Sequence, residues 1–158
     1  MEYSELMQDF IRRLNVADAR ADADGAYHFV IDDMPISFME VADRRELVVW
    51  GEVGELPPGN CARLYRTMLE AMFMGEGTLG NAFSIDRESG RVCLQRIVPL
   101  AVLDPAGFRE LVERFANVLE EWRKLVADFR EVAPELERAE PMREGETGNF
   151  GLGGFMRV

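Results

Sequence analysis

The stretch TLGNAFSIDRESGRVCLQRIVPLAVL, residues 78–103, decides the fold of this chain because it joins a hairpin to a helix start. Two apolar runs, residues 82–85 and 92–94, flank a polar turn in which Asp and Ser side chains bond local backbone and Gly accepts a positive φ. These runs predict two antiparallel strands. Asp104 and Pro105 follow, an N-cap oxygen and a ring with helical φ, and together they predict that a helix begins here.

The hydrophobic pattern predicts the remaining elements. Apolar residues three and four apart indicate amphipathic helices over residues 2–16, 61–74 and 105–132. The last of these carries a heptad-like seam that suits a helix laid on a sheet better than a coiled coil, and Pro134 is expected to end it. Alternating apolar residues predict three further strands, over residues 27–31, 36–41 and 46–53.

This order, helix, three-strand antiparallel meander, helix, β-hairpin and long helix (α-β-β-β-α-β-β-α), predicts an α+β fold. Residues 1–133 then form one domain. Residues 134–158 are acidic and then glycine-rich, without periodicity, and are predicted to be a flexible tail.

Composition excludes several classes of function. The chain has 158 residues, of which 47% are hydrophobic and 30% charged, as expected of a globular protein. A formal net charge of −11 repels a phosphate backbone, so nucleic acid is not an expected partner. The chain has neither a run long enough to insert into a membrane nor a signal-peptide pattern, so we expect a cytoplasmic protein.

The residues that carry chemistry are sparse. His28 is the only histidine, and Cys61 and Cys93 are far apart and fit small apolar positions, so neither a metal site nor a cofactor site is predicted. No nucleophile motif occurs, and adjacent acidic pairs are interpreted as solvated surface. We therefore do not expect an enzyme, although a small-ligand or acid–base enzyme using carboxylates remains a rival interpretation.

Apolar surface and sheet edges favour binding of another polypeptide. A five-stranded sheet in a small domain keeps an edge whose N–H and C=O groups can pair with an added strand. Alternation alone does not decide whether Tyr27, Phe29, Ile36 and Phe38 line the core or a binding groove, and the core is the more common place for such side chains.

With this order of elements in hand, the chain resembles the class I chaperones of bacterial type III secretion, the Tir-chaperone family. The segments that carry the resemblance are MEYSELMQDFIRRL, LYRTMLEAMFMGEGTLGNAFSIDRESGRVCLQRIVPL and LDPAGFRELVERFANVLEEW. The resemblance covers about residues 1–132. It implies a homodimer in the cytoplasm of a Gram-negative bacterium that binds the amino-terminal segment of a secreted effector and keeps it export-competent without ATP.

The resemblance also implies two sets of functional residues. Dimerisation through the second helix and the strand after it assigns an interface to Leu64, Met68, Met72, Phe83 and Ile85. Effector binding near the first helix and early strands assigns hydrophobic patches to Phe10, Leu14, Phe29, Ile31, Ile36 and Phe38. The alternative is a chaperone-like adaptor or regulator that serves no secretion system.

The tail departs from the family pattern. One hypothesis is that Phe150, Leu152 and Phe155 occupy the empty effector groove intermittently, and the simpler interpretation is a passive solubilising segment.

Overall fold

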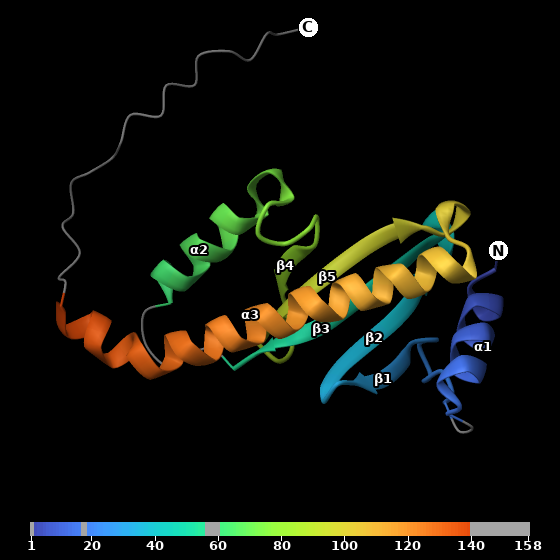
Figure 1. Ribbon diagram of the computed structural model, residues 1–158, viewed down its shortest axis with the longest axis horizontal. Coiled ribbons are helices and arrows are strands. Elements are labelled where there is room, and N and C mark those ends of the chain that lie inside the picture. Colours follow the sequence, from blue (N-terminus) through green and yellow to red (C-terminus); the bar gives the residue numbers. More distant parts are fainter. Residues whose placement is uncertain (1, 17–18, 56–60, 140–158) are drawn as a thin grey trace, which may run out of the picture.

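The helices and strands of the computed structural model follow the predicted order, and the α+β prediction is confirmed (Figure 1). The structure describes residues 2–16, 19–55 and 61–139. The helices are α1 (Tyr3–Leu14), α2 (Ala62–Met72) and α3 (Pro105–Ala139), with short 3-10 helices η1 (Ala42–Arg44), η2 (Phe73–Gly75) and η3 (Leu100–Val102). The strands are β1 (Tyr27–Ile31), β2 (Met34–Val41), β3 (Glu46–Gly54), β4 (Ala82–Ile85) and β5 (Val92–Pro99).

The strands form one antiparallel sheet in the order β1-β2-β3-β5-β4. Asp32 and Asp33 both have positive φ, as a tight two-residue hairpin between β1 and β2 requires. The turn between β4 and β5 is held by the Asp86 carboxylate, which accepts hydrogen bonds from the backbone of Glu88 and Ser89 and from the Ser89 hydroxyl. That hydroxyl is the main cause that lowers the pKa of Asp86.

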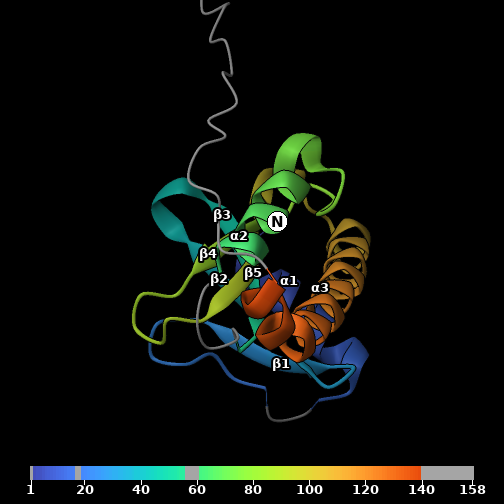
Figure 2. The same cartoon turned by 90° about the vertical axis from the view of Figure 1, so that its left-hand side faces the viewer.

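Long helix α3 lies along one face of the sheet, with α1 beside its amino-terminal half (Figures 1 and 2). Its start is capped as predicted, since the Gly107 N–H donates to the Asp104 carboxylate at 2.7 Å. Leu47, Val49 and Val53 point from β3 toward this helix and are at most 1% exposed. Position 51 is a glycine because Leu119 packs there, and a Cβ would lie 2.5 Å from its Cδ2.

Four phenylalanine rings join the first helix, the sheet and the long helix. Phe10 packs edge-on against Phe29, Phe38 and Phe108, with ring centroids 5.2 to 5.8 Å apart. The Tyr3 O–H donates to the backbone oxygen of Phe38 at 2.8 Å, and burial raises the pKa of this phenol above its usual range. This aromatic cluster fixes α1 against both layers of the fold.

The carboxyl end of α3 differs from the prediction. The helix continues through Pro134 and ends at Ala139. A proline removes one backbone donor from a helix, but residues 135–139 (ELERA) are almost all strong helix formers and carry the helix onward. The predicted tail therefore begins with helical residues, while residues 140–158, with Phe150, Leu152 and Phe155, lie outside the described residues.

Candidate partner-binding surfaces

The residues predicted to bind a partner divide into core and surface. Phe10, Phe29, Ile36 and Phe38 are between 0% and 6% exposed and belong to the core, so a partner cannot touch them while the domain stays closed. Alternation marked one apolar strand face correctly, but it could not reveal that α1 and α3 cover that face. Leu14 is 43% exposed and Ile31 is half-buried, and for these two partner binding stays a prediction.

The residues predicted to form the dimer interface also divide into buried and exposed side chains. Leu64 and Met68 are buried inside their own chain. Met72 and Phe83 are half-buried and contact each other, because the Phe83 backbone N–H donates to the Met72 sulfur at 3.2 Å. Ile85 is 57% exposed on edge strand β4. Of the five, Ile85 has the side chain most open to a second copy.

A neighbouring stripe on α2 is more exposed than the predicted one. Tyr65 and Leu69 lie four residues apart on one side of α2, and Phe73 follows at the same spacing as its C-cap residue, with Leu69 64% and Phe73 75% exposed. Met74, at 80%, and Ile85 lie on the adjoining elements. We call Tyr65, Leu69, Phe73, Met74 and Ile85 the α2 surface. The sequence signal was present, because the spacing of 65, 69 and 73 is as regular as that of 64, 68 and 72.

The turn after α2 holds its apolar side chains outward. Met74 and Leu79 both have positive φ, although neither is a glycine, and Leu79 is 62% exposed. The turn is held against α3, because the Trp122 indole N–H donates to the Gly77 carbonyl at 2.9 Å. Backbone strain at exposed apolar residues is typical of segments shaped for recognition.

The sheet face opposite α3 carries its own apolar band. In the antiparallel register Met39, Val48 and Ile97 lie side by side across three strands, and Trp50 lies one row away. Ile97 is 45% exposed and the other three are half-buried. No described helix packs on this face, which leaves it open to a partner.

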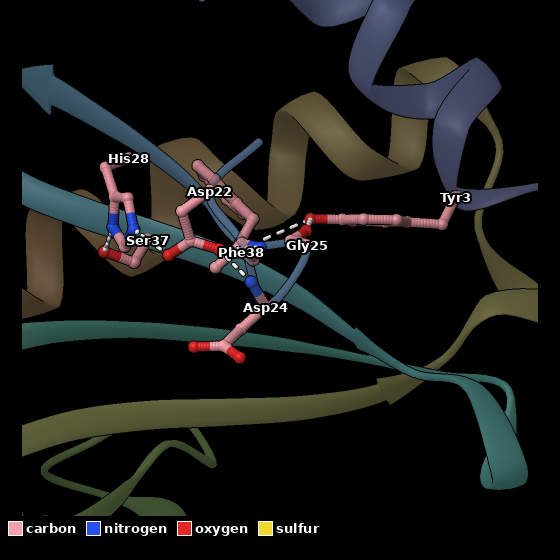
Figure 3. A network of polar contacts seen from close by, with 8 residues as sticks. Tyr3, Asp22, Asp24, Gly25, His28, Ser37 and Phe38 are labelled. Atoms are coloured by element: carbon pink, nitrogen blue, oxygen red, sulfur yellow. Dashed lines mark hydrogen bonds and ion pairs between the residues drawn. The ribbon is translucent and has the colours of Figure 1, made fainter. Parts of the chain in front are cut away.

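His28 lies at one end of this face in a polar network (Figure 3). Its Nδ1 is 2.8 Å from the Ser37 hydroxyl and its Nε2 is 2.9 Å from the Asp22 carboxylate, and its ring packs edge-on against Trp50. Asp22 also accepts the backbone N–H groups of Asp24 and Ala26. The hydrogen bond from His28 is the main cause that lowers the pKa of Asp22.

Ser37, His28 and Asp22 are hydrogen-bonded in the order of a catalytic triad, but their surroundings fit a structural role. Ser37 lies inside β2 between two paired strands, where backbone N–H groups serve the sheet instead of a developing oxyanion. The network instead fastens the connector before β1 to the second strand. Among the described residues no group of three or more metal-ligating side chains occurs, and no helix is long and apolar enough to cross a membrane.

The family model of the Tir chaperone protein (CesT) family matches residues 5–123, well over half of the 158 residues. The chain belongs to this family. A Chlamydia pneumoniae protein designated CPj0713/CpB0740 is 31% identical over 121 residues, which cover 75% of this chain and 91% of that protein. Membership places the chain among chaperones and not among enzymes, as the sequence predicted.

Solved structures show the same fold at low sequence identity. A chain of the ExsC–ExsE complex superposes on this Tir chaperone family member with a TM-score of 0.66 at 19% identity, covering 80% of this chain and 97% of that one. The HopA1–SchA chaperone–effector complex gives 0.60 at 21% identity, covering 82% and 93%. The Yersinia pestis type III secretion chaperone SycH, solved with a fragment of YscM2, gives 0.57 at 16%, covering 76% and 98%.

Proposed function

We propose that this protein is a cytoplasmic, ATP-independent chaperone in a Gram-negative bacterium, which binds the amino-terminal segment of a type III secreted effector and keeps it export-competent. The observation that carries this proposal is the family match over residues 5–123. It is supported by structural neighbours of the same fold that were solved with partner proteins, one of them described as a chaperone–effector complex.

The surfaces of the chain suit such a client. An unfolded segment exposes both apolar side chains and unpaired backbone groups. The open sheet face can contact the apolar side chains, and the sheet edges can pair with the backbone groups. Backbone pairing supplies affinity that tolerates different sequences, while apolar surfaces select the partner. The net charge of −11 keeps exposed apolar surface soluble and favours clients with basic amino-terminal segments.

The proposed chaperone is a homodimer that associates through the α2 surface. Its five side chains include the 75% exposed Phe73 and the 80% exposed Met74, an arrangement that a solitary domain would leave in water. We expect the variant carrying Leu69→Glu and Phe73→Glu to be a monomer by sedimentation velocity. Val30→Glu, at a 73% exposed position on β1, is the matched control and should leave the dimer intact. A double variant that remains dimeric would exclude this surface.

Client binding is tested by purifying the protein gently from its own host and identifying what remains bound. We expect a larger protein that is protected from protease near its amino terminus. Protein bound only to a small molecule, or to a partner that is not secreted, would favour an adaptor or regulator instead.

A further inference from the structure

Strand β5 is longer than the edge strand beside it. Strand β4 pairs with β5 from Ile85 opposite Val92 to Ala82 opposite Gln95 and pairs no further. Strand β5 continues to Pro99, and along this extension β3 is its one partner among the described strands. Its last residues therefore form a short sheet edge next to the end of β4.

The backbone of Ile97 is directed toward this edge. In an antiparallel sheet each residue directs both its N–H and its C=O toward one neighbouring strand, and the next residue directs both toward the strand on the other side. The Phe83 N–H bonds the Met72 sulfur instead of β5, so Phe83 and its partner Leu94 form a pair without mutual hydrogen bonds, and Leu94 bonds β3. Three residues on, Ile97 has the opposite orientation, and its N–H and C=O point past the end of β4.

A hollow lies on each side of this edge. The larger, of about 540 Å³, lies toward α3 and has an apolar lining of Leu79, Val98, Val102, Leu103, Leu111 and Phe115. The smaller, of about 460 Å³, is lined by Gly80, Ala82, Gln95, Arg96 and Ile97. Successive side chains of an added strand point to opposite faces, so such a strand would place them in the two hollows alternately.

The edge is locally basic in an acidic protein. Arg96 lines both hollows, and its guanidinium donates to the Leu79 carbonyl at 2.9 Å. Among the described residues it forms no ion pair within 4.0 Å. The other charges of the larger hollow, Glu110 and Arg114, are paired with each other at 2.6 Å. Arg96 therefore offers its remaining donors to an incoming carboxylate.

We propose that this edge binds an extended segment of the client as an added strand, with an acidic residue opposite Arg96 and an apolar residue two positions away. Side chains two apart share one face of a strand, so the acid meets Arg96 while the apolar side chain, opposite Val98, fills the larger hollow. The residue between them pairs with the backbone of Ile97. The inference rests on the proposed chaperone function and names the chemistry of one client element.

The test is a titration of the isotope-labelled full-length protein with an end-blocked peptide, Gly-Ser-Leu-Thr-Asp-Thr-Leu-Ser-Gly, followed by the amide resonances. The sequence places Leu two residues from Asp on both sides, so it presents the pattern in either strand direction. We expect saturable shifts centred on Arg96, Ile97 and Val98, with a dissociation constant of about 1 mM or below, as suits a short strand. Replacing the peptide Asp by Lys should weaken binding about tenfold.

Two variants and one matched control locate the binding site. Arg96→Glu is expected to weaken the Asp peptide about tenfold, whereas Arg87→Glu, the same charge change in the exposed hairpin turn, should leave it within about twofold. Ile97→Pro removes the outward N–H and should abolish binding. Absence of saturable shifts up to about 5 mM peptide, shifts centred elsewhere, or equal binding by Arg96→Glu and wild type would overturn the inference.

The same variants separate this inference from the chaperone function. If the client captured from the host binds wild type and Arg96→Glu equally, the edge site is refuted and the chaperone function stands. If wild type captures no secreted client, the chaperone function fails. An Ile97 amide that is already protected from exchange without peptide, and loses protection when the dimer is dissociated, would mean that a second copy fills the edge, and would also overturn the inference.

Discussion

Replacing Phe38 by Ala distinguishes a core residue from a partner-binding one. Phe38 is 0% exposed, and its ring lies 5.5 to 5.8 Å from the rings of Phe10, Phe29 and Phe108. Truncating a buried Phe costs about 3–5 kcal/mol, since it loses transfer free energy and leaves a cavity. A residue of an open binding patch would lose less than about 1 kcal/mol of stability.

The assay is urea unfolding followed by tryptophan fluorescence at fixed protein concentration. With a slope of about 2 kcal/mol per molar urea, Phe38→Ala should lower the midpoint by about 1.5–2.5 M. The matched control is Leu14→Ala, at a 43% exposed position, which should cost less than about 1 kcal/mol. If Phe38→Ala does not accumulate in folded form, Phe38→Leu should still cost about 1–2 kcal/mol. Equal midpoints for the two alanine variants would refute the assignment of Phe38 to the core.

Three further predictions concern the sheet contact, the turn after α2 and the polar network. Gly51→Ala should lower the unfolding free energy by about 1–3 kcal/mol, because the added Cβ would lie 2.5 Å from Leu119; an unchanged urea midpoint would contradict the close approach. Trp122→Phe should cost about 1–2 kcal/mol and speed amide exchange around Gly77, whose carbonyl loses its indole donor; unaltered exchange there would argue against the anchor. The pKa of Asp22 is lowered in the folded state, so the stability that its carboxylate contributes is present above the pKa of the unfolded state and is lost as the pH falls through the pKa of the folded state. Asp22→Asn should therefore lose less stability than the wild type below about pH 4. Identical stability of the two proteins across the acid range would count against this network.

The element order was predictable because local rules and the global fold agree in this chain. Asp86 and Gly90 specify the hairpin turn, and Asp104 and Pro105 specify the start of α3. Pro134 is an exception, because the helix continues through it to Ala139 over residues that are strong helix formers.

The assignment of surfaces was less predictable. A period of two identifies an apolar strand face without showing which helix covers it, so the pattern alone did not exclude a groove lined by Ile36 and Phe38, which are buried. On α2 two stripes of apolar residues lie side by side, and only the packing of the helix against the core and β4 decides that Leu64 is buried and Leu69 exposed. The free edge at Ile97 depends on where β4 stops pairing, which no local pattern encodes.

Native mass spectrometry of the protein purified gently from its own host tests whether it is a dimeric chaperone with a bound client. We expect a complex of two copies of the chain with one larger protein, whose bound segment lies near its amino terminus. A bare monomer, or a dimer that carries only a small molecule, would contradict it.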